Sequence, residues 1–265
     1  MTGITETEAI ARVADTGILL VALDFDGTLS PLVDEPMQAR MLPEARTALD
    51  ALLAAPDTIV ALVSGRSLGD LRVIAEHDDD SPILLAGSHG AEFWIPGEGD
   101  VTHADAPEDA RLRDELRAHA EAATAHLDGV WIEPKTFGFG VHTRKLSPAD
   151  AEEANRLVDT LVAAEAPHWR RRTGHNIIEY AFRHEGKDSA VAELRERVGA
   201  TAVLFAGDDV TDEDALRSLG PADLGVLVGD RDSAASAKVA DIAALAELLE
   251  RLAGARSARA SSAGE

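Results

Sequence analysis

Four short apolar runs recur along the chain, and each one ends in a cluster of small or polar residues. The runs are Ile18 to Leu23, Thr58 to Val63, Ala202 to Ala206 and Leu224 to Val228. Apolar runs of this length without alternation are typical of strands that are buried on both faces of a parallel sheet. Between them, segments 43–53, 188–198 and 241–252 carry apolar residues at intervals of three and four, which predicts helices. This alternation predicts an α/β fold with a parallel sheet and right-handed crossovers.

The middle of the chain has a different pattern. Residues 136–143 alternate apolar or aromatic residues with glycine and polar ones, which predicts a strand. Short strands at 169–172 and 176–181 and acidic helices at 109–125 and 147–164 complete a predicted α+β insertion. The expected organisation is a core made of residues 1–93 and 181–253, an inserted domain at 94–180 and a flexible tail at 254–265.

Composition and charge exclude several classes of function for this chain. The 265 residues are 45% hydrophobic and carry a net charge of -23, which disfavours nucleic acid and anionic membranes as partners. The chain has no cysteine, so disulfides, thiolate metal sites and cysteine nucleophiles are excluded. The N-terminus lacks the apolar stretch of a secretory signal, and no apolar run approaches the roughly 20 residues of a membrane span. The sequence therefore predicts a cytoplasmic protein.

Two acidic clusters follow predicted strands. Asp24 and Asp26 come directly after the first strand, and Gly27 lets the chain turn sharply there. Residues 208–214 hold five carboxylates, of which we assign Asp212 and Asp214 chiefly to capping or orientation, and the two clusters together are a candidate metal site. Carboxylates that meet across a sheet repel each other unless a divalent cation neutralises them, and oxygen ligands beside a phosphate suit Mg²⁺.

Two further motifs suit an anion. Ser64, Gly65 and Arg66 close the second strand and offer a hydroxyl and backbone N–H groups at the start of the next helix, where phosphates bind favourably. Lys187 is placed at the start of a predicted helix, where its charge opposes the helix dipole. Taken alone, each feature is more often an ordinary cap or a solvated lysine.

The order DFDGT, SGR, Lys187 and GDD resembles the four motifs of the haloacid dehalogenase superfamily. This resemblance implies a Rossmann-like core with the middle segment as a cap domain. It implies that Asp24 is the nucleophile and Asp26 the general acid and base, and that Ser64 and Lys187 hold the phosphoryl oxygens. Asp24, the backbone carbonyl of Asp26 and Asp208 are implied as Mg²⁺ ligands, with Asp209 close behind them.

Within the superfamily, the chain most resembles the trehalose-6-phosphate phosphatase family. The features that carry this resemblance are DFDGTLSPL, the stretch from Ala86 to Glu92, the cap segments 133–135 and 140–144, and GDDVTDEDAL. The resemblance implies sugar contacts in the cap and substrate contacts near its boundary with the core. These residues are Glu133, Lys135 and Glu179 in the cap and Gly65, Arg66 and His89 near the boundary. Pro134 and Thr143 depart from the family pattern, which leaves the identity of the sugar open.

The resemblance also implies a phosphoric monoester hydrolase that acts on a small sugar phosphate and is functionally paired with a sugar-phosphate synthase. Three other functions stay open. One is a phosphatase for another sugar or pseudo-sugar phosphate, and another is a phosphomannomutase-like enzyme. The third is a non-catalytic phospho-acceptor module, which would have no use for Asp26 or a long cap.

Overall fold

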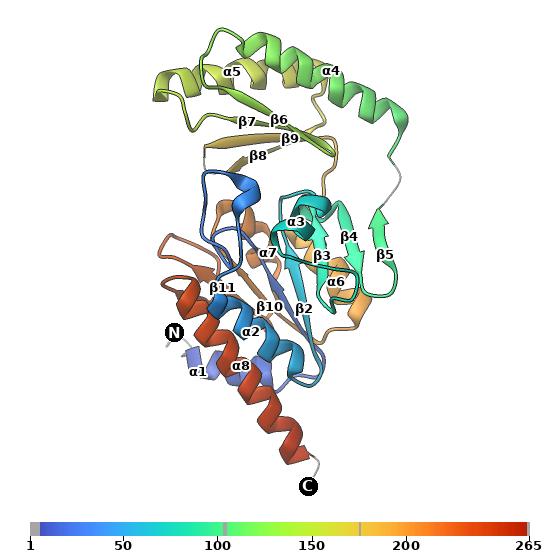
Figure 1. Cartoon of the computed structure of the whole chain (residues 1–265), viewed down its shortest axis with the longest axis vertical. Helices are drawn as coiled ribbons and strands as arrows, with labels where there is room; N and C mark the ends of the chain where they lie inside the picture. The colour runs from blue at the N-terminus through green and yellow to red at the C-terminus, as the bar shows by residue number, and fades with distance from the viewer. Residues whose placement is uncertain (1–5, 103–104, 175, 264–265) are drawn as a thin grey trace. The chain divides into compact units, whose positions relative to one another are not determined.

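The computed structural model describes residues 6–102, 105–174 and 176–263. The chain forms two compact units, one made of Met1–Thr102 and Glu185–Glu265 and the other of His103–His184. We call the first the core unit and the second the inserted unit (Figure 1). The predicted α/β core with a smaller α+β unit is confirmed.

The core unit is built on one sheet of eight strands, in the order β12-β11-β10-β1-β2-β3-β4-β5. Six neighbouring strands, from β12 to β3, are parallel. They are β1 (Leu19–Leu23), β2 (Thr58–Val63), β3 (Leu84–Gly87), β10 (Ala202–Gly207), β11 (Leu224–Val228) and β12 (Ala237–Val239). Strand β1 lies between β10 and β2, so the ends of these three strands meet at one edge of the sheet.

Helices cover both faces of this sheet. Alternate residues of β1 supply the two apolar cores: Leu19, Val21 and Leu23 join one, and Leu20 and Ala22 join the other. The first core is closed by α1 (Glu6–Ala14), α2 (Pro43–Ala54), α3 (Leu68–Ile74) and α8 (Ile242–Ala263). The second is closed by α6 (Lys187–Val198) and α7 (Glu213–Ser218). Short 3₁₀ turns are η1 (Pro36–Gln38), η2 (Ser88–Gly90) and η3 (Val210–Asp212). Helices α1, α2 and α8 are seen together in Figure 1.

A hairpin of β4 (Glu92–Ile95) and β5 (Gly99–Thr102) extends the core sheet. Strand β4 pairs antiparallel with β3, and Phe93 and Ile95 are buried in the core. The boundary predicted at residue 94 therefore falls inside a strand of the core sheet, and the inserted unit begins at His103. It ends at His184 rather than at residue 180.

The inserted unit packs two helices on one face of a four-stranded antiparallel sheet with the order β6-β7-β9-β8. Its helices are α4 (Pro107–Thr124) and α5 (Pro148–Glu165), and its strands are β6 (Trp131–Lys135), β7 (Gly138–His142), β8 (Arg170–Gly174) and β9 (Ile177–Ala181). Side chains such as Ile132, Phe139 and Tyr180 pack with the helices in its apolar core. The alternate residues of the same strands make up the opposite face of the sheet, which we call the open face.

The C-terminal segment differs from the prediction of a flexible tail. Helix α8 continues to Ala263, and residues 264 and 265 lie outside the described part. The reason is Arg256, which is 2% exposed and donates hydrogen bonds to backbone carbonyls that include those of Ala14, Gly17 and Asp57. No helix among the described residues has the length and apolarity to cross a membrane.

Candidate active site

The parallel sheet brings the predicted motifs to one edge. In the register, Leu23 of β1 pairs with Leu62 of β2 on one side and with Ala206 of β10 on the other. Each motif begins one or two residues beyond these positions. The loops after β1, β2 and β10 therefore meet at the carboxyl ends of the strands, where ligands bind in open α/β sheets.

Asp24 and Lys187 form a buried ion pair at this edge. The Nζ atom of Lys187 lies 2.5 Å from Oδ1 of Asp24 and 2.6 Å from Oδ1 of Asp212. Thr28 donates a hydrogen bond of 3.3 Å to Oδ2 of Asp24. Burial raises the pKa of Asp24 well above its usual range, and the Lys187 ammonium offsets only part of that rise. Burial would lower the pKa of Lys187, but Asp212 and Asp24 outweigh it and raise that pKa.

Asp208 lies against the loop that follows Asp24. A Cβ atom added to Gly27 would be 2.1 Å from Oδ2 of Asp208, so only glycine leaves room for this carboxylate. The backbone of Gly27 also has φ +81°, which L side chains rarely adopt. The Oδ1 atom of Asp208 is buried and has no hydrogen-bond partner among the described residues. Burial and the neighbouring Asp212 carboxylate raise the pKa of Asp208 to about 7.

These carboxylates fit a cation site. Among the described residues, Asp24, Asp208 and Asp212 each place one carboxylate oxygen within 4.8 Å of the others. Lys187 supplies a single positive charge to three carboxylates, and one Asp208 oxygen is left without a donor. A hard divalent cation with oxygen ligands would satisfy that oxygen and neutralise the excess charge. The donor set therefore suits a metal ion.

Asp212 has the expected capping role, because its Oδ2 accepts a hydrogen bond of 2.9 Å from the N–H of Asp209, and it also belongs to the three-carboxylate cluster. Asp209 lies outside the three-carboxylate cluster, and its Oδ1 accepts a hydrogen bond of 2.7 Å from the N–H of Val210 as the cap of η3. Asp212 is fully buried and contacts Lys187. The 3₁₀ turn explains the additional contact with Lys187, because it brings Asp212 back against Gly207 at the end of β10. The four-residue spacing between Asp208 and Asp212, about one helical turn, is the sequence signal for their shared position.

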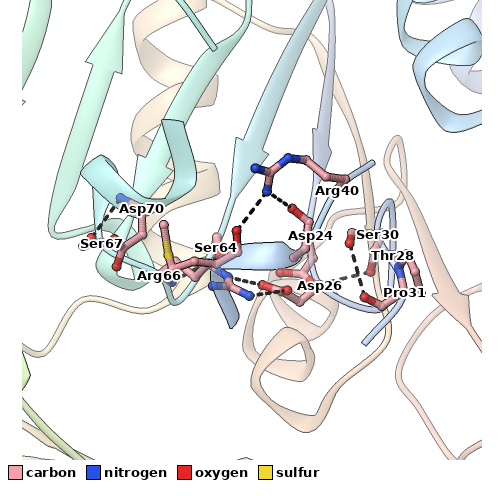
Figure 2. A network of polar contacts seen from close by, with 12 residues as sticks. Asp24, Asp26, Thr28, Ser30, Pro31, Arg40, Ser64, Arg66, Ser67 and Asp70 are labelled. Atoms are coloured by element: carbon pink, nitrogen blue, oxygen red, sulfur yellow. Dashed lines mark hydrogen bonds and ion pairs between the residues drawn. The ribbon is translucent and has the colours of Figure 1, made fainter. Parts of the chain in front are cut away.

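Asp26 is held by Arg66. The guanidinium makes two parallel contacts, with Nε 2.6 Å from Oδ2 and Nη2 2.7 Å from Oδ1 (Figure 2). Both side chains are partly exposed, so Asp26 is accessible while its orientation is fixed. Bidentate contacts of this kind define direction as well as charge. Sequence reasoning assigned Arg66 to the substrate, and the structure shows this additional contact.

Ser64 belongs to a tightly held loop at the end of β2. Its side chain is buried, and its Oγ accepts a hydrogen bond of 3.1 Å from the N–H of Arg66. The N–H groups of His89 and Ser88 bind the carbonyls of Ser64 and Arg66, at 2.9 and 2.6 Å. The His89 ring also covers Gly65, where an added Cβ would be 2.6 Å from the ring. Ser64, Gly65, Arg66 and His89 are thus brought together beside the acidic cluster.

Glu133, Lys135 and Glu179 lie together on the open face of the inserted unit. Lys135 Nζ is 2.9 Å from Oε2 of Glu133 and 3.3 Å from Oε1 of Glu179. His142, which sequence reasoning did not single out, places Nε2 2.9 Å from Oε2 of Glu133. Burial would raise the pKa of Glu133, but the contacts with His142 and Lys135 outweigh it and lower that pKa. The predicted sugar contacts therefore form one charged network.

Comparisons with known proteins agree with this arrangement. Residues 22–245 match the family model described as Trehalose-phosphatase. A trehalose-phosphate phosphatase of Mycobacterium marinum is 32% identical over 226 residues, which cover 81% of this chain and 56% of the relative. A Mycobacterium tuberculosis protein named an uncharacterized glycosyl hydrolase is 35% identical over 238 residues, which cover 82% of this chain and 17% of the relative. The chain thus spans about half or less of the length of these relatives.

A solved structure shows the same fold. The C-terminal domain of a C. albicans trehalose-6-phosphate phosphatase superposes with a TM-score of 0.79 at 21% identity, covering 95% of this chain and 98% of that one. The fold of this chain is therefore that of the solved domain, an α/β core with an inserted α+β unit. From the extent of the family match and of the similarity to its relatives, the chain belongs to the trehalose-phosphatase family.

Proposed function

We propose that this chain is a Mg²⁺-dependent phosphatase that hydrolyses trehalose 6-phosphate to trehalose and inorganic phosphate. The observation that carries the proposal is the buried Asp24 carboxylate, held by Lys187 next to the unpartnered oxygen of Asp208. A nucleophile, a fixed positive charge and a cation site at one strand edge are what phosphoryl transfer requires. The family match supports trehalose 6-phosphate as the substrate.

In the first step, an Asp24 carboxylate oxygen attacks phosphorus while the bond between phosphorus and the sugar oxygen breaks. Asp26 gives a proton to the departing sugar oxygen, and an aspartyl-phosphate is left. In the second step, Asp26 takes a proton from water as that water attacks phosphorus. This releases inorganic phosphate and restores the Asp24 carboxylate.

The remaining core residues hold charge and geometry. Lys187 and Ser64 would bind phosphoryl oxygens, and Gly65, Arg66 and His89 would shape the loop around them. Asp24, Asp208 and the backbone carbonyl of Asp26 would hold the cation, with Asp212 beside it. Bound there, Mg²⁺ would neutralise charge on the phosphoryl group. Asp209 would act through the turn that it caps.

Glu133, Lys135 and Glu179 would bind sugar hydroxyls, because carboxylates accept and an ammonium donates several hydrogen bonds. We also propose a cytoplasmic location and a functional pairing with a sugar-phosphate synthase, since trehalose 6-phosphate must be made before it is hydrolysed. Support for both comes from the sequence and the family alone.

The test is phosphate release from trehalose 6-phosphate, glucose 6-phosphate, sucrose 6-phosphate and mannosyl-3-phosphoglycerate, with Mg²⁺ or with EDTA. We expect release from trehalose 6-phosphate with Mg²⁺, loss in EDTA and loss in Asp24→Asn. Release only from another sugar phosphate would identify that compound as the substrate, and the proposed mechanism would still apply. Conversion of one sugar phosphate into an isomer without phosphate release would indicate a mutase.

Asp208→Asn and Asp209→Asn form a matched pair for the cation site. We expect Asp208→Asn to abolish activity. We also expect this variant to lose the rise in melting temperature that Mg²⁺ causes in the unsubstituted protein. Asp209→Asn should keep that rise, because its carboxylate caps a turn. The opposite result would return Asp209 to the cation site.

A further inference from the structure

Trp131 and His142 form an exposed aromatic stack on the open face of the inserted unit. Their ring centroids are 4.5 Å apart and their planes are inclined by 22°. The two residues are directly opposite each other in the register of β6 and β7. Trp131 is 48% exposed, whereas the other tryptophans of the chain, Trp94 and Trp169, which are both described, are 3% and 7% exposed. One flat apolar ring is therefore kept in contact with solvent.

The stack has a fixed orientation. His142 holds one face of Trp131, and its Nε2 lies 2.9 Å from Oε2 of Glu133. Glu133 in turn contacts Lys135. The exposed ring is thus the end of a connected set of side chains, and little further ordering is needed before it binds a flat ligand.

The stack adjoins the charged network described above. Glu133 and Lys135 follow Trp131 at two-residue intervals on the same face, at a spacing of about 7 Å for each two residues of a strand. On the neighbouring strand β7, Gly140 and Gly138 are opposite Glu133 and Lys135. A Cβ atom added to Gly140 would be 3.0 Å from Cδ1 of Ile177 and 3.4 Å from Oε2 of Glu133, so glycine at this position leaves room for the side chains of the network.

A sugar ring matches both parts of this surface. Its hydroxyl groups suit the carboxylates and the ammonium, and its C–H-rich face suits the negative face of an aromatic ring. Two carboxylates near the stack disfavour a phosphate there and favour an uncharged ring. We propose that Trp131 stacks on the sugar ring that lacks the phosphate, and so selects a disaccharide phosphate over a monosaccharide phosphate. This inference rests on the proposed function and adds a specificity residue to it.

The first test compares kcat/KM of the full chain and of Trp131→Ala for trehalose 6-phosphate and glucose 6-phosphate. We expect Trp131→Ala to lower kcat/KM about tenfold for the disaccharide phosphate, mainly through KM, and to leave the monosaccharide phosphate within about twofold. Trp131→Phe should recover most of the loss, since it keeps an aromatic face. Arg111→Ala, an exposed change on α4, is the control and should alter neither substrate.

The second test does not depend on turnover. Asp24→Asn protein is titrated with trehalose while tryptophan fluorescence is recorded, and we expect a saturable change that disappears in Asp24→Asn/Trp131→Phe. Equal losses of kcat/KM for both substrates in Trp131→Ala, or a fluorescence change that survives without Trp131, would overturn the inference while the phosphatase activity stands. If the wild-type chain releases phosphate from no disaccharide phosphate, the proposed function fails, and the trehalose titration then decides the stacking by itself.

Discussion

Arg66 binds Asp26 through two parallel contacts, with Nε 2.6 Å from Oδ2 and Nη2 2.7 Å from Oδ1. This pair fixes the direction of the carboxylate that would move protons in both chemical steps. Lysine keeps the charge but has no fork with which to hold both oxygens. Replacing Arg66 with lysine therefore tests the orientation of Asp26 while the positive charge is kept.

We predict that Arg66→Lys lowers kcat by about 10- to 100-fold, because a misdirected proton donor protonates the leaving oxygen poorly. Steady-state kinetics with Mg²⁺ and trehalose 6-phosphate measures this. Arg46→Lys, at a more exposed arginine of the core unit, is the matched control and should change kcat less than twofold. An unchanged kcat in Arg66→Lys would show that the fork is dispensable.

Gly27 and Gly97 allow a second matched comparison. Their φ angles are +81° and +82°, so alanine is strained at both, by about 1–2 kcal/mol. Only at Gly27 does the added Cβ meet Asp208, while the site at Gly97 has no described atom within 4 Å. We predict that both alanine variants lose similar free energy of unfolding from strain, and that Gly27→Ala also loses at least about 100-fold in kcat/KM. Urea unfolding and phosphate release measure the two effects. Equal activity in both variants would refute a tight fit between Gly27 and Asp208.

Lys187 forms ion pairs with two buried carboxylates, so its removal should affect folding as well as activity. We predict that Lys187→Met is inactive and loses about 3–5 kcal/mol of unfolding free energy, because Asp24 and Asp212 are left buried without a partner. Adding Asp212→Asn should restore part of the stability and none of the activity. Urea unfolding monitored by circular dichroism measures stability, and Lys145→Met is the exposed control. Unchanged stability in Lys187→Met would mean that the carboxylates have another source of compensation.

The core motifs at Asp24, Ser64 and Asp208 were predictable because each follows a strand that is buried on both faces. Such strands have a clear apolar pattern, and parallel pairing places their ends together whatever the loops do. Asp24 and Ser64 were therefore located from sequence alone, whereas Lys187 was located from its place at the start of a helix and from the order of the motifs. The capping role of Asp212 was also predicted, but its contact with Lys187 was not, since that contact depends on the 3₁₀ turn that Asp209 caps.

The inserted unit and the sheet edge were harder to predict. The segment around Trp94 was assigned to the inserted domain from the sequence, but its short strands pair with the core sheet. Likewise, the contact of His142 with Trp131 and Glu133 depends on the register of β6 and β7, and no spacing along the chain fixes that register. Pairing between strands decides both features, so they emerge only from the folded structure.

The C-terminal helix gives a last prediction. Arg256 is 2% exposed and reaches carbonyls in the segments that precede β1 and β2, among them Gly17 at 2.7 Å and Asp57 at 2.8 Å. Its removal leaves these carbonyls without that donor and opens space beneath the sheet.

We predict that Arg256→Ala lowers the unfolding free energy by about 2–4 kcal/mol, since hydrogen bonds to a charged group contribute about 1.5–3 kcal/mol each and water replaces some of them. Arg251→Ala, on the exposed side of the same helix, should change it by less than about 0.5 kcal/mol. If the two variants unfold at the same urea concentration, helix α8 is held by its apolar face alone. The segment after residue 254 would then contribute little to the free energy of unfolding.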